Sequence, residues 1–156
     1  MNEETRKSVA TGISMLGLYL QQVIDDQGMQ KALDYCNKVG YAFGSGTGVT
    51  LKEKFGKQTP TTEQLKQVLI GNLNDFGQDY EISAGQDRVD VKIKKCPFYD
   101  GLSSVGMTHD VITQFCKSIG SGERAAMKDA VPELEPFSTP MSKVGDVCLE
   151  GYKIKK

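Results

Sequence analysis

Three cysteines in the C-terminal half of the sequence are the residues best suited to chemistry. Cys96, Cys116 and Cys148 lie far apart along the chain, and none of them belongs to a C-x-x-C pair. Their spacing therefore excludes a zinc finger and a thioredoxin motif. We expect them at the exit of one strand, in a helix and in a later strand, where they can meet at a helix-on-sheet interface. Thiolates that converge there would suit zinc or another soft metal.

The fourth ligand of such a metal stays open. Glu123, Glu135 and Glu150 are the carboxylate candidates, and His109 is the only histidine. His109 precedes Cys116 by two helical turns, a distance of about 10 Å along the axis, which is too long for both to share one ion. The plainer alternative is three buried thiols without chemistry, because free cysteine is among the most buried residue types.

Cys96 is also a candidate nucleophile. A catalytic Cys–His pair needs the imidazole within hydrogen-bond reach of the thiol and a third group that orients the ring. His109 and Asp110 supply these residue types. A Cys-Pro dipeptide such as Cys96-Pro97 also occurs where haem iron takes a thiolate ligand. Pro97 has a simpler role as well, since proline has no N–H for a strand ladder. The sequence leaves these roles open.

The composition restricts the class of protein. A length of 156 residues predicts a single domain over 1–156, with an N-terminal helical part at 1–60 and an α+β core at 61–156. The net charge of −1 and the lack of a basic face exclude sustained nucleic-acid binding. The N-terminus lacks a signal-peptide pattern, and the apolar stretch over 12–24 is too short to span a bilayer. We therefore expect a cytoplasmic protein without membrane insertion, whose cysteines are thiols or metal ligands.

Hydrophobic periodicity predicts helices in the first half and an antiparallel sheet in the second. We expect helices over 3–26, from Met29, and from Thr61 or Thr62 to before Gly77. The strands "DYEIS" and "RVDVKIK" form a hairpin, and helical spacing follows over 107–119 and 123–131, with a break at 120–122. A proline-containing stretch is irregular or lies at a sheet edge, and "VCLEGYKIK" is the closing strand. The fold class is α+β, with N-terminal helices packed on a sheet of about four strands that a helix interrupts.

The glycines at positions 40, 44 and 48 are four residues apart. If the second helix continues through them, they form a smooth stripe against which another helix can pack closely. A phosphate-binding loop is excluded, because Val49-Thr50 stands where Lys-Ser/Thr is required. The sequence does not fix where this helix ends.

The chain from Leu65 to Ile154 resembles 4-vinyl reductase domains and the related L-2-amino-thiazoline-4-carboxylic acid hydrolase-like proteins. The segments "VDVKIKKCPF", "ITQFCKSIG" and "VGDVCLEGYKI" carry this resemblance. It implies a fold shared with the ligand-binding domains of nitric-oxide signalling and Golgi transport proteins. It also implies a small hydrophobic ligand and, in some members, zinc held by cysteines and a glutamate.

Some site residues follow from the resemblance by position. Cys96 and Cys148 match ligand cysteines, and Cys116 fits the hydrolase-like pattern. Sensor proteins with a 4-vinyl reductase domain usually have a Glu-x-x-Cys motif shortly before the Gly-Asp turn. This chain lacks the motif: the region has Glu133 and Glu135 but no cysteine.

Three functions are compatible with these features. The first is a small hydrophobic-ligand-binding domain with a metal (zinc) or thiol site at Cys96, Cys116 and Cys148. Its pocket would lie between the glycine-rich helix and the sheet, and the expected lining residues are Tyr41, Phe43, Phe98, Tyr99 and Phe115. The second is a hydrolase of a small cyclic thiazoline-type acid that uses Cys96. The third is a dimeric scaffold or tethering-type subunit without chemistry, which would associate through the long apolar face of the first helix.

Overall fold

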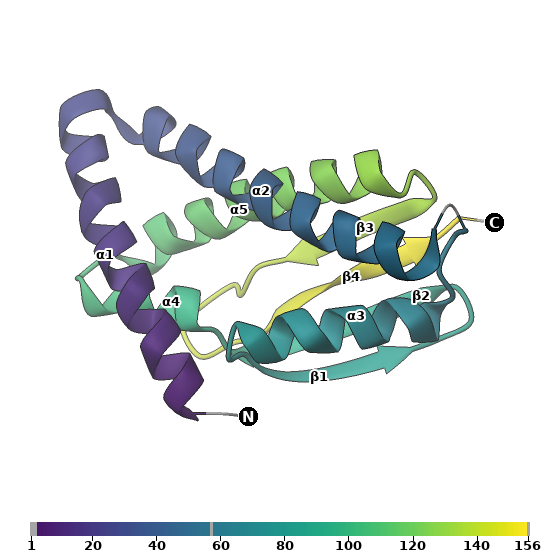
Figure 1. Cartoon of the computed structure of the whole chain (residues 1–156). Helices are drawn as coiled ribbons and strands as arrows, with labels where there is room; N and C mark the ends of the chain where they lie inside the picture. The colour runs from purple at the N-terminus through teal and green to yellow at the C-terminus, as the bar shows by residue number, and fades with distance from the viewer. Residues whose placement is uncertain (1–2, 57, 156) are drawn as a thin grey trace.

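The computed structural model describes residues 3–56 and 58–155, and within them the chain forms five helices and a four-stranded antiparallel sheet (Figure 1). The elements in chain order are α1 (Glu3–Gln27), α2 (Met29–Phe55), α3 (Thr62–Asp75), β1 (Asp79–Ala84), β2 (Arg88–Lys95), α4 (Pro97–Ser104), α5 (His109–Ala130), β3 (Leu134–Thr139) and β4 (Cys148–Ile154). The predicted α+β fold class is therefore confirmed. No helix within the described ranges has both the length and the hydropathy that crossing a bilayer requires.

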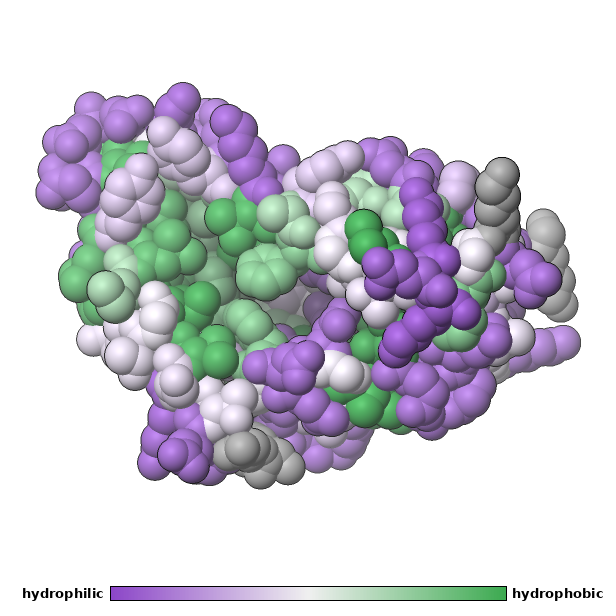
Figure 2. All heavy atoms as spheres, in the orientation of Figure 1, coloured by the Kyte–Doolittle hydropathy of each residue, from purple (hydrophilic) through white to green (hydrophobic). Residues whose placement is uncertain are grey.

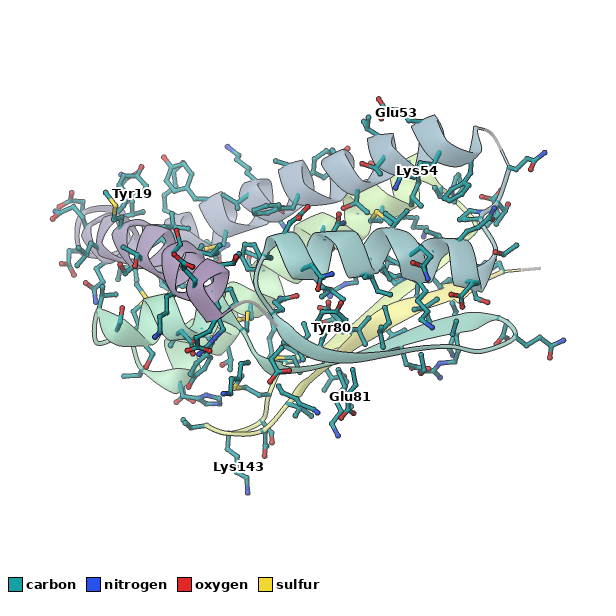
Figure 3. All side chains as sticks on the ribbon, turned by 60° about the horizontal axis from the view of Figure 1, so that its bottom comes forward. Tyr19, Glu53, Lys54, Tyr80, Glu81 and Lys143 are labelled. Carbon is teal, nitrogen blue, oxygen red and sulfur yellow. The ribbon has the colours of Figure 1, made fainter. Side chains whose placement is uncertain are left out.

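The sheet has the order β1-β2-β4-β3, and each neighbouring pair is antiparallel. Helices α2, α3 and α5 lie over one face of it (Figure 1). The opposite face is open, and Glu81 of β1 points away from the helices there (Figure 3). On the covered face, the buried Val89, Val91 and Ile93 alternate along β2. The alternating pattern "RVDVKIK" thus gives one buried and one solvated face, as predicted.

Two apolar clusters stabilise the fold. One lies between the sheet, α3 and the C-terminal half of α5, and its largest buried members include Leu51, Leu65, Met127 and Leu134. The other joins α1, the first half of α2, α4 and the start of α5, and its members include Leu20, Cys36, Leu102, Ile112 and Phe115. Helix α1 therefore belongs to a helical layer at one end of the molecule, away from the sheet (Figure 1).

The glycine stripe of α2 packs directly against α5. A Cβ atom on Gly40 would lie 2.6 Å from the carbonyl carbon of Ile119, and one on Gly44 would lie 2.9 Å from the Cβ of Ala126. A Cβ on Gly122 of α5 would lie 2.7 Å from the backbone nitrogen of Tyr41. Real Cβ atoms do not approach other atoms this closely, so both helices need glycine at their contact. The predicted close packing along the stripe is confirmed, and α2 continues through it to Phe55.

The predicted helix break at 120–122 is wrong. Helix α5 runs without interruption from His109 to Ala130, because Gly122 admits the backbone of α2 instead of ending the helix. The chain also forms a helix, α4, directly after Cys96, which the periodicity did not indicate. Pro97 occupies the first turn of α4, where a missing N–H costs nothing.

Candidate functional site

The structure places the three cysteines of the predicted site in one region. Cys96 follows the last residue of β2 and caps the N-terminus of α4, Cys116 lies in α5, and Cys148 begins β4. The thiols of Cys96 and Cys148 are near enough to Cys116 to raise its pKa by charge repulsion, in addition to the larger effect of burial. The expected meeting of a strand exit, a helix and a later strand is thus present in the fold.

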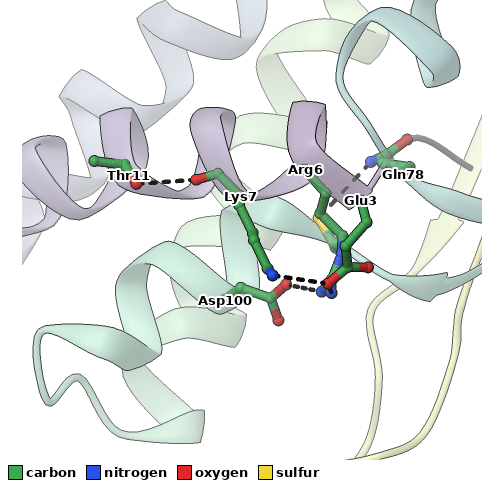
Figure 4. A network of polar contacts seen from close by, with 7 residues as sticks. Glu3, Arg6, Lys7, Thr11, Gln78 and Asp100 are labelled. Atoms are coloured by element: carbon green, nitrogen blue, oxygen red, sulfur yellow. Dashed lines mark hydrogen bonds and ion pairs between the residues drawn. The ribbon is translucent and has the colours of Figure 1, made fainter.

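The surroundings of these thiols favour the protonated form. The side-chain amide of Gln78 donates to the Cys96 sulfur at 3.7 Å, a contact drawn in Figure 4. Burial outweighs this bond and raises the pKa of Cys96 to about 11. Burial likewise raises the pKa of Cys148. Because the thiolate is the nucleophile and the metal ligand, the site does not activate cysteine at neutral pH.

His109 and Asp110, the other catalytic candidates, begin α5. The Nδ1 atom of His109 lies 3.1 Å from the hydroxyl of Tyr99, and Asp110 is exposed. A Cys96–His109 pair therefore stays a prediction. In the part of the chain that the structure describes, no group of three or more His, Cys, Asp or Glu side chains is arranged to hold a metal ion. Zinc and haem ligation therefore stay predictions of the sequence.

The five predicted pocket residues do not share one pocket. Phe98 and Phe115 are buried in the apolar cluster around α4, and Tyr99 packs against that cluster's edge. Tyr41 and Phe43 are exposed on the outer side of α2 instead. The glycine stripe of α2 faces α5 and not the sheet.

Sequence reasoning missed Cys36, which lines a small apolar cleft between α1, α2 and α5. The cleft has a volume of about 180 Å³ and is lined by Leu16, Tyr19, Leu20, Tyr35, Cys36, Lys38, Val39 and Ile119. Burial raises the pKa of Cys36 to about 12. Its position four residues before Gly40 on the buried stripe of α2 was the available signal. The cleft is smaller than the pockets of about 300–1,000 Å³ that usually hold small molecules.

The outer face of α1 is exposed although it carries no charge. From Ser8 to Ile24 the helix has no Asp, Glu, Lys or Arg. Met15, Leu18 and Tyr19 are 70%, 57% and 54% exposed. Figure 2 shows hydrophobic residues gathered over α1 and the first half of α2, around a hollow between the two helices. In Figure 3, Tyr19 points away from the body of the molecule.

The outer face of α2 has the same character. No charged residue occurs from Val39 to Leu51, and Tyr41, Phe43 and Val49 are exposed there. The ring of Phe43 packs edge-on against Phe76, with 6.1 Å between the centroids. We call these two surfaces the α1 face and the α2 face.

Polar contacts hold the inner side of α1 in place, so the α1 face belongs to a fixed element. Arg6 makes ion pairs with Asp100 of α4 and with Glu3, as Figure 4 shows. Gln21 donates to the backbone carbonyl of Val105 at 3.1 Å. A Cβ on Gly101 of α4 would lie 2.7 Å from the Cβ of Ile13, so the two helices pack closely.

Comparison with known proteins gives a likeness of fold. No protein-family model matches the chain. No curated protein matches it either. Among solved structures it is similar to a trafficking protein particle complex subunit 3 from Naegleria fowleri, covalently bound to palmitic acid. The TM-score is 0.54 and the sequence identity 13%, over 93% of this chain and 96% of that one. At this identity the likeness shows the fold alone.

The resemblance to 4-vinyl reductase domains and thiazoline hydrolase-like proteins is corrected by these comparisons. The structural neighbour is a subunit of a trafficking complex, which is a different family. The resemblance relied on three short segments around cysteines. In the structure these segments are a strand exit, a helix interior and a strand start, and their cysteines are half-buried free thiols.

Proposed function

We propose that this chain is a dimeric scaffold or tethering-type subunit that binds protein through its uncharged helical faces. The observation that carries the proposal is the α1 face, an exposed surface of four helical turns without a single charge. Exposed apolar surface of this extent marks an interaction site in soluble proteins, because leaving it in water is unfavourable.

The area of the two faces suits a protein interface. Met15, Leu18, Tyr19, Tyr41, Phe43 and Val49 are the large hydrophobic side chains exposed on α1 and α2. A large side chain that is half exposed offers about 100 Å², so the six together offer about 600 Å². This area is divided between the two faces, so both faces together approach the 800 Å² or so that each partner buries in a standard interface, and the α1 face alone offers about half of the 600 Å².

Two further observations support a role in assembly over a role in chemistry. The cysteines are protonated at neutral pH, because burial raises the pKa of each one. The protein of similar fold is a subunit of a multi-protein complex. A cytoplasmic location is part of the proposal, since four unpaired cysteines suit a reducing compartment.

Binding of a small hydrophobic molecule is the second candidate. The cleft beside Cys36 is lined almost wholly by apolar side chains, and the protein of similar fold holds palmitic acid covalently. We rank it second because about 180 Å³ is too little for a long acyl chain, whose sixteen carbons need about 400 Å³ or more if each takes about the volume of a water molecule. Intact mass spectrometry of the purified chain would show an acyl adduct, and an unmodified mass after gentle and denaturing preparation would exclude a covalent one.

Site-specific photo-crosslinking in the cells of origin tests the proposed function. Benzoylphenylalanine replaces Tyr19 on the α1 face, Phe43 on the α2 face, or Val144 as a control. Val144 is 69% exposed, and its neighbour Lys143 lies on the side of the molecule opposite Tyr19 in Figure 3. We expect protein adducts at positions 19 and 43 and none at 144. Equal adducts at all three positions, or none, would overturn the proposal.

A further inference from the structure

The α1 face contains a heptad stripe. Ser8, Met15 and Gln22 are seven residues apart, and so are Thr11, Leu18 and Asp25. All six residues are exposed, and together they alternate in steps of three and four along one side of the helix. In a seam along which two helices pack side by side, residues at this spacing are apolar, and the central Met15 and Leu18 meet that condition. The uncharged part of the stripe therefore fits another helix of similar length.

The charges at the two ends of the stripe select an antiparallel partner of the same sequence. Lys7 is exposed at the N-terminal end, where its Nζ atom lies 3.8 Å from Glu3 Oε1, and Asp25 and Asp26 are exposed at the C-terminal end. A second α1 running antiparallel brings Lys7 next to Asp26 of the partner subunit at both ends. A parallel arrangement would place like charges together, which costs energy and disfavours it.

Gly12 provides the space that such a partner needs. It is exposed inside α1, and a Cβ atom on it would meet nothing within 4 Å in this chain. A glycine on the exposed side of a helix is unfavourable relative to alanine. Its presence at position 12 therefore suggests a close contact with another molecule. When Met15 lies opposite Leu18 of the partner subunit, Gly12 lies level with Gln21 of the partner subunit and about 3 Å along the helix axis from Tyr19 of the partner subunit. The ring of that tyrosine can occupy the space that a side chain at position 12 would fill.

A membrane surface fits the α1 face less well than a second copy. Helices that lie on anionic membranes carry Lys and Arg along the border of their apolar face. Here the C-terminal border has Asp25 and Asp26, and no Lys or Arg occurs between Lys7 and Lys31. The charges therefore oppose an anionic surface and complement another α1.

We propose that two copies of this chain dimerise through antiparallel α1 helices, with the two-fold axis between Met15 and Leu18. The inference rests on the proposed function and deepens it by naming the partner and the register. The pairing is self-complementary, as a two-fold interface requires, because Thr11 meets Gln22 of the partner subunit in both directions. The α2 face stays free for another component of an assembly.

Disulfide trapping tests the register. A tagged Thr11→Cys variant and an untagged Gln22→Cys variant are oxidised alone and as a mixture, with the unsubstituted chain as the control for its native thiols. Antiparallel helices bring position 11 of one copy to position 22 of the other, so we expect the crosslink only in the mixture. Crosslinking of each variant alone would show a parallel arrangement, and no crosslink above the control would show that α1 is not the interface. Either result overturns the inference.

Sedimentation measurements separate this inference from the proposed function. We expect a dimer for the unsubstituted chain and for Val144→Lys, and at least about 30-fold weaker dimerisation for Met15→Lys. Circular dichroism checks that Met15→Lys is folded, which its exposure leads us to expect. A dimer that Met15→Lys leaves intact overturns the α1 geometry but not the scaffold role. A monomer at about 100 μM overturns the geometry too, and the crosslinking in cells then decides the scaffold role.

Discussion

Two groups of helix glycines in this chain have opposite surroundings. Gly40 and Gly44 of α2 face α5 so closely that a Cβ on either would overlap a neighbouring atom. Gly12 of α1 and Gly46 of α2 face outward, and a Cβ on either would meet nothing within 4 Å. All four lie inside a helix, where glycine has a similar intrinsic cost relative to alanine. The inner pair recovers that cost through the contact with α5, whereas the outer pair has no such contact within the chain.

The different surroundings of the two pairs show what a glycine inside a helix can indicate about packing. Where a second helix of the same chain covers it, the glycine reports a contact that the fold already contains. Where an uncharged, exposed surface surrounds it, as at Gly12 between Ser8 and Met15, the same residue indicates a contact that the fold leaves unfilled. Substitutions at the two kinds of position should therefore act on different equilibria.

The largest effect is expected for Gly40→Ala. The new Cβ would lie 2.6 Å from the Ile119 carbonyl carbon, and because this neighbour is backbone it cannot rotate away. We expect the free energy of unfolding to fall by about 3 kcal/mol or more, at the upper end of overpacking effects. Urea denaturation followed by circular dichroism measures this change.

Gly46→Ala is the matched control on the same helix. It adds the same methyl group where nothing lies within 4 Å, so we expect a gain of up to about 1 kcal/mol from helix propensity. Equal effects of the two substitutions would contradict close α2–α5 packing. A similar loss at Gly46 would show that the α2 face is covered within the chain.

Helix α5 contacts the sheet through acidic groups, in contrast to its glycine-lined contact with α2. The Tyr152 hydroxyl donates to a Glu123 carboxylate oxygen at 3.4 Å, and Glu150 lies on the same face of β4. Burial, with a smaller contribution from the charge of Glu123, raises the pKa of Glu150 from 4.5 to about 7. Burial also raises the pKa of Glu123. The folded chain therefore binds more protons than the unfolded chain between about pH 4.5 and 7.

This contact predicts a pH dependence of intermediate size. A raised carboxyl pKa means that stability is present below pH 4.5 and is lost as the pH rises through about 7. We expect Glu150→Gln to raise the free energy of unfolding at pH 8 by about 2 kcal/mol and to leave it nearly unchanged at pH 4.5. Denaturation across this pH range measures both. Glu135→Gln is the control, because Lys155 lowers the pKa of that exposed carboxyl and the sign of its pH dependence is opposite. An unaltered pH profile for Glu150→Gln would contradict a buried acidic contact.

The sequence predicted the helices and strands better than it predicted the contacts between them. Local signals were sufficient for the hairpin of β1 and β2 and for the capping of α3 by Thr61, because alternation and capping act between near neighbours. The prediction of a helix break at 120–122 was wrong because Gly122 packs against α2, a helix whose contacting residue Tyr41 lies about eighty residues earlier in the chain. Such a contact leaves no local trace in a single sequence.

The candidate site illustrates the same limit. The three cysteines were correctly placed on a strand exit, a helix and a later strand, yet their chemistry depends on burial, which raises their pKa values and which spacing does not report. Tyr41 and Phe43 were assigned to a pocket because they flank the glycine stripe, but they lie on the outer side of the same helix. The apolar spacing of the first helix, which suggested dimerisation, belongs to residues such as Leu20 and Val23 that pack inward against the cluster of α2, α4 and α5. The exposed Met15, Leu18 and Tyr19 were not predicted, because spacing does not report which side of a helix the rest of the chain covers.

The smallest and most discriminating effect is expected for Gly12→Ala. Because nothing in the chain lies within 4 Å of the new Cβ, we expect the folded monomer to gain up to about 1 kcal/mol from helix propensity. In an antiparallel α1 pair the same methyl group would occupy the space of the Tyr19 ring of the partner subunit, so the dimer should weaken. Denaturation at low concentration and sedimentation at high concentration measure the two changes separately.

Opposite signs for these two changes would be difficult to obtain from any other arrangement. A substitution that only improves the helix would stabilise the monomer and leave the dimer constant unchanged, which is the result we expect for Gly46→Ala. If Gly12→Ala also stabilises the monomer and leaves the dimer constant unchanged, Gly12 does not lie in the interface and the two-fold axis does not lie near Met15. Its failure to stabilise even the monomer would instead show that the space around Gly12 is already filled by this chain.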